Sequence, residues 1–217
     1  MNENKYGILI VDDHPLVRSG LSAVLQSEPN LRICCEAESM TEALQLVEKL
    51  TPDLVIIDLS LKDGDGLELV KRLKKKHPRL KMLVCSVFDE SLFARRALTA
   101  GAMGYISKKE ATKRIIEAVR SVLRGEFFVS DEMIQQTLQD LAKQGQQPHD
   151  FLTTLSDREW QVYRLIGSGV SNAQIAEQLH ISVKTVENHK ETLKKKLNLA
   201  SAKDLTRHAM QWLMNEA

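Results

Sequence analysis

The feature that most constrains the fold is a regular alternation of two patterns over the first 125 residues. Short apolar runs, typical of buried strands, alternate with longer stretches whose apolar residues recur at helical spacing. The expected strands are residues 7–11, 31–35, 54–57, 82–84 and 103–106, and the expected helices are 15–25, 41–50, 66–76, 91–100 and 112–123. Strands joined through helices run parallel and are covered on both faces. The pattern therefore predicts an α/β fold with a doubly wound, five-stranded parallel sheet.

The rest of the chain lacks this alternation. Residues 131–143 have a helical pattern, and residues 144–150 are polar and without periodicity, which is typical of a linker. Beyond them, the expected helices are 157–167, 172–179, 183–197 and 202–212. We therefore expect a domain at residues 1–125, a linker with a helix at 126–150, and a small all-α domain at 151–217.

Composition narrows the class of protein. The formal net charge of +1 excludes a polybasic protein that binds by bulk charge, although it permits a localised basic face. The cysteines Cys34, Cys35 and Cys85 have neither the spacing of a metal site nor that of a disulfide framework. The first apolar run is too short for a signal peptide, and no run approaches the ~20 residues of a membrane helix. We expect a cytoplasmic protein without a membrane partner.

Polar residues stand where the expected strands end. Asp12 and Asp13 follow the first strand, Asp58 the third, Ser86 the fourth and Lys108 the fifth. Ligands of doubly wound sheets bind beyond the carboxyl ends of the strands, so these side chains should gather at one edge. Three adjacent carboxylates repel one another and favour a hard cation, for which Mg²⁺ is the natural candidate.

Such a set of residues has a definite chemistry. A carboxylate beside Mg²⁺ and a lysine can attack phosphorus, while the cations neutralise the phosphoryl oxygens and Ser86 donates a hydrogen bond to them. Taken singly, each acid has a simpler interpretation as a turn residue or a helix cap, and Asp13 would fit as the cap of the helix that begins near Pro15. The presence of all five residues at the correct strand ends favours the joint site.

Four stretches carry a resemblance to a known family: ILIVDDHP at 8–15, DLVIIDL at 53–59, DGLE at 65–68 and GAMGYISK at 101–108. Through them, residues 7–125 resemble the flavodoxin-like receiver domain of two-component response regulators. The resemblance implies that Asp58 accepts a phosphoryl group from a histidine kinase. It implies that Asp13, Asp58 and the backbone carbonyl of Ser60 bind Mg²⁺ directly, and that Asp12 acts mainly through metal-bound water.

The same resemblance also implies which residues respond when Asp58 is phosphorylated. Ser86 and Lys108 are the implied phosphate-sensing pair, and Tyr105 is the aromatic residue that changes rotamer on activation. Lys62 occupies a position where the family usually has proline. Ser60 and Phe88 occupy the positions that tune hydrolysis of the acyl phosphate, so the lifetime of the phosphorylated state stays open.

The C-terminal pattern predicts a helix-turn-helix. Ser156 and Glu159 have the spacing of a capping box, which starts a helix. The expected helices at 172–179 and 183–197 are separated by a short turn, and residues 181–197 contain five lysines against two glutamates. The alternatives are a solvated helix end for Lys194–Lys196 and a small dimerisation bundle for the whole segment.

Further motifs resolve these alternatives: LSDRE at 155–159, GVSNAQIA at 169–176 and ISVKTVENH at 181–189. Residues 152–213 resemble the LuxR-type DNA-binding domain, and the whole chain resembles the NarL/FixJ class of response regulators. The resemblance implies double-stranded promoter DNA as the partner and homodimerisation on phosphorylation, with the last helix pairing the DNA-binding domains. Contact with RNA polymerase is left open.

The expected recognition helix at 183–197 has two faces. Val186 and Leu193 have the spacing of inward-facing residues. Asn and Glu side chains on the other face can read base edges, whereas lysines more often hold phosphates. The residues expected to contact DNA are Lys184, Thr185, Glu187, Asn188, His189, Lys190, Glu191 and Lys194, of which Lys184, Lys190 and Lys194 are assigned to phosphates.

Two rival functions remain. A Mg²⁺-dependent phosphatase with an aspartyl-phosphate intermediate would usually carry a second Asp two residues after the nucleophile, where this chain has Ser60. A DNA binder that ignores phosphorylation would be expected to have lost part of the acidic site, which is intact here. The preferred hypothesis is a phosphorylation-controlled transcription regulator rather than an enzyme.

Overall fold

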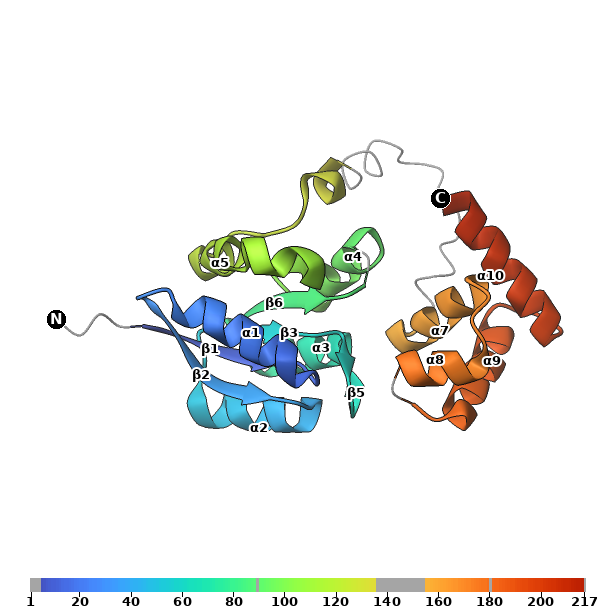
Figure 1. Cartoon of the computed structure of the whole chain (residues 1–217), viewed down its shortest axis with the longest axis horizontal. Helices are drawn as coiled ribbons and strands as arrows, with labels where there is room; N and C mark the ends of the chain where they lie inside the picture. Colours follow the sequence, from blue (N-terminus) through green and yellow to red (C-terminus); the bar gives the residue numbers. More distant parts are fainter. Residues whose placement is uncertain (1–4, 89, 136–154, 180, 217) are drawn as a thin grey trace. The chain divides into compact units, whose positions relative to one another are not determined.

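The computed structural model describes residues 5–88, 90–135, 155–179 and 181–216. The chain divides into two compact units, Met1–Lys143 and Gln144–Ala217. Each unit is drawn in Figure 1 and is taken by itself below. No helix among the described residues is both long enough and apolar enough to cross a membrane.

The N-terminal unit is built on a five-stranded parallel sheet. Its strands are β1 (Tyr6–Val11), β2 (Leu31–Ala37), β3 (Leu54–Ile57), β6 (Lys81–Ser86) and β7 (Gly104–Ser107). Their order, β2-β1-β3-β6-β7, is that of a flavodoxin-like doubly wound sheet. The predicted fold class is therefore confirmed.

Helices cover both faces of this sheet (Figure 1). The helices are α1 (Pro15–Gln26), α2 (Met40–Leu50), α3 (Gly66–Lys76), α4 (Glu90–Ala100) and α5 (Lys108–Arg124). α1 and α5 share one core with alternate residues of the strands, such as Ile8, Ile10 and Ile56. α2 and α4 pack against the sheet from the other side, and α3 packs between them.

Several local features differ from the sequence prediction, and among them strands β2 and β6 are each longer than expected. α5 begins at Lys108 rather than at residue 112, because the Ser107 side chain caps the helix by accepting a hydrogen bond from the backbone N–H of Lys109. The charged residues 108–110 obscured this first turn. The capping interpretation of Asp13 is wrong, since the residue that precedes α1 is His14 and no side chain caps that helix.

A small hairpin was not predicted. Strands β4 (Ser60–Leu61) and β5 (Gly64–Asp65) pair antiparallel immediately after the loop that holds Asp58. Each strand has only two residues, which is too short for a period-2 pattern to be detected. The hairpin shapes the segment between β3 and α3.

The C-terminal unit contains four described helices, α7 (Asp157–Gly167), α8 (Asn172–Gln178), α9 (Val183–Lys196) and α10 (Ala202–Glu216). The predicted capping box of Ser156 and Glu159 is present. Trp160 packs edge-on against Trp212 with ring centroids 4.9 Å apart, which fixes α7 against α10. α10 extends beyond the predicted end at residue 212, because apolar residues and good helix formers continue the pattern.

The segment that follows α5 continues the sheet. Phe128 forms a parallel bridge with Gly104 of β7. Residues 131–135 are helical, in agreement with the start of the expected helix at 131–143. The remainder of that helix and the expected linker at 144–150 lie outside the described residues.

Candidate functional site

Three carboxylates gather at the carboxyl edge of the sheet. Asp12 and Asp13 follow β1, Asp58 follows β3, and their exposed fractions are 2%, 7% and 1%. One ligand atom from each of these residues and from His14 lies within 4.8 Å of the others. The sequence predicted the three acids together, and it missed His14, whose Nδ1 lies 2.6 Å from Oδ1 of Asp13.

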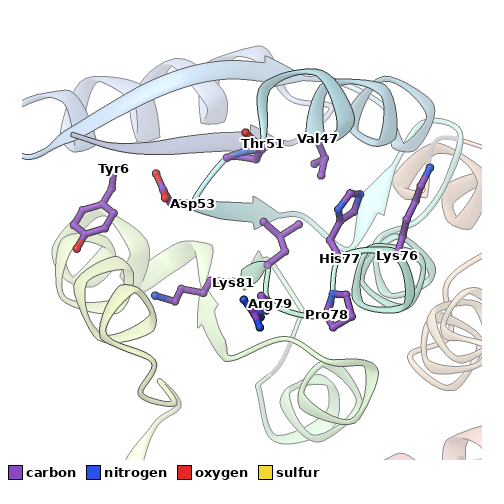
Figure 2. A pocket seen from close by; sticks show the side chains of 11 residues that line it. Tyr6, Val47, Thr51, Asp53, Lys76, His77, Pro78, Arg79 and Lys81 are labelled. Atoms are coloured by element: carbon purple, nitrogen blue, oxygen red, sulfur yellow. The ribbon is translucent and has the colours of Figure 1, made fainter. Parts of the chain in front are cut away.

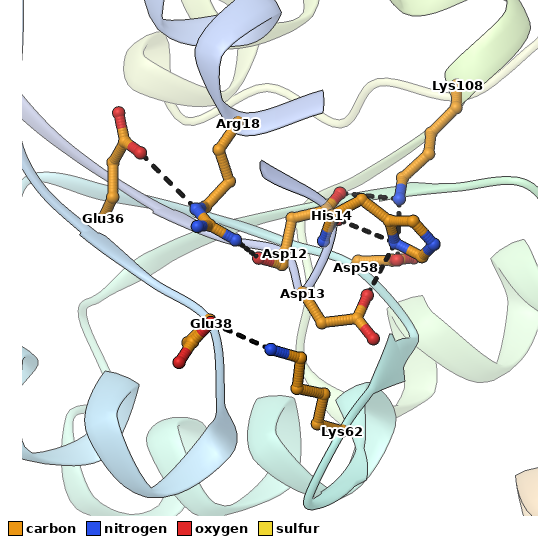
Figure 3. Close-up of polar contacts among 9 residues, drawn as sticks. All are labelled: Asp12, Asp13, His14, Arg18, Glu36, Glu38, Asp58, Lys62 and Lys108. Atoms are coloured by element: carbon orange, nitrogen blue, oxygen red, sulfur yellow. Dashed lines mark hydrogen bonds and ion pairs between the residues drawn. The ribbon is translucent and has the colours of Figure 1, made fainter. Parts of the chain in front are cut away.

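Lys108 lies between two of the acids (Figure 3). Its Nζ is 2.7 Å from Oδ2 of Asp58 and 2.6 Å from Oδ2 of Asp12. The Ser107 cap starts α5 at Lys108 and so fixes the backbone that carries this ammonium group. The predicted convergence of Lys108 with the acids is therefore present in the structure.

Burial and the neighbouring charges act in opposite directions on the pKa values of Asp58 and Lys108. Burial raises the pKa of Asp58 to about 6, and the charge of Asp12 raises it as well, while Lys108 opposes them. Burial by itself lowers the pKa of Lys108, but the charges of Asp58 and Asp12 outweigh it and raise that pKa. Asp58 is therefore mostly ionised at neutral pH and Lys108 is cationic.

The pocket fits a hard divalent cation. Oδ1 of Asp58 is buried and accepts no hydrogen bond from the described residues. A buried carboxylate oxygen without a hydrogen bond costs free energy of folding unless a cation or a further donor contacts it. Three carboxylates at this spacing provide the oxygen donors that Mg²⁺ prefers. Ser60, at the start of β4, is half-buried two residues beyond Asp58.

The predicted switch residues lie on the neighbouring strands. Ser86 ends β6, which pairs with β3 on one side and with β7 on the other, and its side chain is fully buried. The hydroxyl of Tyr105, in β7, donates a hydrogen bond of 2.9 Å to the carbonyl of Phe88. Oγ of Ser86 accepts a long hydrogen bond of 3.4 Å from the N–H of Phe88. Ser86 and Tyr105 therefore hold the same residue of the loop between β6 and α4.

Supporting residues that the sequence did not reveal hold the pocket in place. Nη1 of Arg18 donates a 2.5 Å hydrogen bond to the backbone carbonyl of Asp12. Nε of Arg18 lies 3.5 Å from Oε2 of Glu36 in β2 (Figure 3). An arginine in the first turn of a helix carries no sequence signal for such a role, because the contact depends on how α1 packs over β1 and β2.

The hairpin after Asp58 is also braced. The carboxylate of Asp63 accepts hydrogen bonds from the N–H groups of Met40 and Thr41 at the start of α2, at 2.7 and 3.0 Å. Lys62, at the position where the family usually has proline, pairs with Glu38 at 3.0 Å (Figure 3). Both contacts attach the hairpin to the segment between β2 and α2.

Gly66 is required for the approach of α3 to the acidic pocket. A Cβ atom at this position would lie 2.1 Å from the backbone oxygen of Asp58 and 2.6 Å from Cα of Leu59. The N–H of Gly66 donates a 3.0 Å hydrogen bond to the carbonyl of Leu59. Only glycine allows the two backbones to come this close.

In the C-terminal unit, α9 has the predicted two faces. Val186 and Leu193 are fully buried against the other helices. Among the expected DNA contacts, four are exposed and four are half-buried. The exposed residues are Lys184, Glu187, Asn188 and Glu191, and the half-buried residues are Thr185, His189, Lys190 and Lys194.

The half-buried residues have identified surroundings. The N–H of Thr185 donates to Oγ of Ser182 and so belongs to the helix cap. Nζ of Lys190 donates a 3.0 Å hydrogen bond to Oδ1 of Asn172 at the start of α8. Burial lowers the pKa of His189, and the nearby charge of Arg158 lowers it further. His189 is therefore a half-buried residue near the charged residues at the start of α7.

A second concavity lies at the opposite edge of the sheet (Figure 2). It has a volume of about 590 Å³ and is lined by residues around Asp53, His77 and Lys81. Asp53 already accepts a 2.7 Å hydrogen bond from the N–H of Gly7, and Lys81 donates to the carbonyl of Leu123. Asp53 and Lys81 are thus satisfied within the protein, whereas Nε2 of His77 is buried and has no hydrogen-bond partner among the described residues. The acidic pocket is the stronger candidate site, because it gathers three buried carboxylates and a lysine.

Comparisons with known proteins identify the families of both domains. Residues 8–120 match the response regulator receiver domain, and residues 153–209 match the bacterial regulatory proteins of the luxR family. The oxygen regulatory protein NreC of Staphylococcus epidermidis is 35% identical over 94% of this chain and 96% of its own. The response regulator protein VraR of Staphylococcus aureus is 34% identical with the same coverage. The transcriptional regulatory protein DegU of Brevibacillus brevis is 32% identical over 92% of this chain and 90% of its own.

Solved structures show the same architecture. RcsB from Salmonella enterica serovar Typhimurium, bound to a promoter in the presence of phosphomimetic BeF3⁻, has a TM-score of 0.60 and 25% identity over 95% of this chain and 98% of its own. A LuxR-family two-component response regulator from Aurantimonas has a TM-score of 0.60 and 29% identity. It covers 64% of this chain and 99% of its own.

Proposed function

Because the chain belongs to the NarL/FixJ-class response regulators, which join a receiver domain to a LuxR-type DNA-binding domain, we propose that Asp58 is its phosphoacceptor. The protein is a DNA-binding regulator of transcription. The observation that carries the proposal is the position of Asp58, which is buried beside Asp12 and Asp13 with Nζ of Lys108 2.7 Å away. Phosphorylation by a histidine kinase controls dimerisation and promoter binding.

The nucleophile is the Asp58 carboxylate. Its pKa of about 6 leaves it mostly ionised at neutral pH, and Oδ1 is the oxygen without a hydrogen-bond partner among the described residues. This oxygen attacks the phosphorus of a phosphohistidine, the P–N bond breaks, and the imidazole leaves with the electron pair. The ammonium group of Lys108 neutralises charge on the transferred group.

Asp12, Asp13 and Asp58, with the backbone carbonyl of Ser60, would hold Mg²⁺. When bound, this ion supplies positive charge to the phosphoryl oxygens. The buried Oδ1 of Asp58 and the spacing of the three carboxylates support this assignment. Arg18, through the carbonyl of Asp12, positions the first of these acids.

Ser86, Lys108 and Tyr105 form the switch. A phosphoryl group on Asp58 draws Lys108 away from Asp12 and takes the hydroxyl of Ser86 as a donor. Ser86 then releases the N–H of Phe88, and the hydrogen bond from Tyr105 to the Phe88 carbonyl is rearranged. The surface of α4 and β7 changes between two arrangements, which biases dimerisation.

The exposed face of α9 reads promoter DNA. Asn188, Glu187 and Glu191, which are exposed on this face, contact base edges. Lys184, Lys190 and Lys194 hold phosphates. Thr185 contacts the DNA backbone at the start of α9, and His189, which is half-buried in the same helix, supports the reading face. Double-stranded promoter DNA is the proposed partner, with a homodimer formed on phosphorylation through α10.

The related RcsB, which is bound to a promoter in the presence of BeF3⁻, supports this assignment. Access to the chromosome of a bacterium implies a cytoplasmic protein. We further propose the domain limits 1–125 and 151–217 with a linker between them. The two compact units divide the chain within this linker, and the first of them extends to Lys143. Contact with RNA polymerase stays open.

The test is covalent labelling with radioactive acetyl phosphate. The full-length protein should take up label that hydroxylamine releases, as expected of an acyl phosphate, and Asp58→Asn or Asp58→Ala should take up none. Asp131→Asn is the matched control, because Asp131 is an exposed acid outside the pocket. Persistent label in Asp58→Ala would refute the assignment. Rapid, sustained hydrolysis of a generic phosphate ester would favour the phosphatase alternative.

A further inference from the structure

The two cysteines of β2 form a pair with an unusual geometry. Cys34 and Cys35 are neighbours in the edge strand, both are half-buried, and their Sγ atoms lie 3.5 Å apart. Neighbouring side chains of a regular strand point to opposite faces. Contact between adjacent thiols therefore requires a local departure from strand geometry.

A bulge in β2 provides this departure. Ile8 of β1 is opposite Ile33, and the next residue, Leu9, is opposite Cys35, so Cys34 has no partner residue on β1. A bulged residue leaves the regular alternation and can redirect its side chain. The thiol of Cys34 lies 3.3 Å from the carbonyl oxygen of Ile8, to which it donates. The irregularity falls on the residue that must turn for the two sulfurs to meet.

The sulfur separation suits a chelate better than a disulfide. Two sulfurs 3.5 Å apart can both lie ~2.3 Å from one ion, with an angle of ~100° at that ion. A disulfide joins Cα atoms that are about 4.4–6.8 Å apart, whereas the Cα atoms of neighbouring residues are only about 3.8 Å apart. Oxidation of the pair would strain β2, and chelation would leave the sulfurs close to their present positions.

We propose that Cys34 and Cys35 form a dithiol site for a trivalent, thiophilic metalloid of the arsenite class. Two As–O bonds and two S–H bonds break, two As–S bonds form, and two waters leave, with no change of oxidation state. Soft thiolates select soft ions. Among the described residues no third metal-ligating side chain gathers with the pair, so one arsenic ligand stays an oxygen. Zinc sites with a structural role use four protein ligands, which this site lacks.

The third cysteine is an internal control. Cys85 lies in β6 and is 1% exposed. Burial raises the pKa of the Cys85 thiol to about 12, and it raises the pKa of the Cys35 thiol to about 12 as well. Cys85 therefore differs from the pair in its burial and its isolation rather than in its acidity. A reagent that requires two adjacent and accessible thiols should react with the pair and leave Cys85 unmodified.

Phenylarsine oxide is the probe, because it condenses with two thiols and releases one water. The full-length chain should bind one equivalent by intact mass, with loss of two thiols that are otherwise reactive in the native protein. Cys34→Ser and Cys35→Ser each leave one thiol, and each should weaken binding by about 10²-fold because the second bond is no longer intramolecular. Cys85→Ala should bind as the unchanged protein does. Arsenite should compete with the probe at the same site.

Three outcomes would overturn the proposal: stoichiometric binding that survives Cys34→Ser, an adduct on Cys85, or no binding to the unchanged protein. Tighter binding of Zn²⁺ than of arsenite would refute the class of ligand. Label uptake by Asp58 from acetyl phosphate should be retained in both serine variants, which shows that they fold and separates this test from that of the proposed function.

Discussion

The backbone N–H of Tyr105 donates a 2.8 Å hydrogen bond to the carbonyl of Phe128. Phe128 in turn donates through its N–H to the carbonyl of Met103 at 3.0 Å, so the segment leaving α5 extends the sheet beside the switch aromatic. Oε1 of Glu90, the first residue of α4, accepts a 2.7 Å hydrogen bond from the N–H of Ser130. The start of the segment towards the DNA-binding domain is thus attached to both elements of the proposed switch.

Glu90→Ala should detach this segment without unfolding the receiver domain. The variant removes a hydrogen bond from a charged acceptor, which contributes ~1.5–3 kcal/mol. The amide of Ser130 should exchange its hydrogen at least about tenfold faster, as measured by hydrogen exchange. Glu90→Gln is the matched control, because its amide oxygen can still accept the bond. Unchanged exchange in Glu90→Ala would show that Phe128 alone holds the segment.

Asp58 should make stability depend on pH. Its pKa is raised from 3.8 to about 6 by burial, so the folded state binds more protons than the unfolded state between these values. Stability from this group is therefore present below pH 3.8 and is lost as pH rises to about 6, by ~3 kcal/mol. In urea unfolding without Mg²⁺, the free energy of unfolding of Asp58→Asn should rise relative to that of the unchanged protein as pH increases from about 4 to about 6. A constant difference between the two proteins would contradict the raised pKa.

Lys108→Met should destabilise the receiver domain by ~3 kcal/mol, because it leaves the buried carboxylates of Asp12 and Asp58 without their cation. Combined with Asp58→Asn, the same change should cost clearly less, because one of the unpaired charges is then absent. Denaturant unfolding of the two single variants and the double variant measures this coupling. Additive effects would mean that the ion pair contributes nothing.

Gly66→Ala should destabilise the protein by ~2 kcal/mol and slow phosphorylation, since the new Cβ would collide with the backbone of Asp58 and Leu59. Gly20→Ala is the matched control. A Cβ at Gly20 meets nothing within 4 Å, and the residue is inside α1, so alanine should stabilise the helix by up to ~1 kcal/mol. Thermal unfolding and the rate of label uptake check both variants. Equal effects would refute the close approach at Gly66.

Lys190→Ala and Asn188→Ala should affect DNA binding differently. The lysine variant should weaken binding to all sequences alike and reduce the salt slope by about one, as expected for a phosphate contact. The asparagine variant should lose ~1–3 kcal/mol of discrimination at one base position only. Titrations at several salt concentrations separate the two effects, and Lys203→Ala, an exposed lysine of α10, is the control. A sequence-dependent loss in Lys190→Ala would reverse the assignment.

The local sequence pattern was sufficient to predict the bounds of an element where the element is a buried strand or a helix with a side-chain cap. The bounds of β3, Leu54–Ile57, and of α3, Gly66–Lys76, were predicted to the residue. β3 is apolar throughout because both of its faces are covered, and α3 begins at a cap, Asp65, whose side chain accepts from the N–H of Leu67. The start of α5 was missed because its first turn is charged, and the β4–β5 hairpin because it is too short to show a period.

The sequence by itself determined which residues stand at the carboxyl ends of the strands, since strand period and parallel connection follow from local chemistry. Only the tertiary structure decided which side chains meet. It brings Lys108 between Asp12 and Asp58, Arg18 to the carbonyl of Asp12, and the thiol of Cys34 to that of Cys35. These contacts depend on strand register and helix packing between segments far apart in the chain. Burial then sets the pKa of Asp58, and burial is a property of the whole fold rather than of any local pattern.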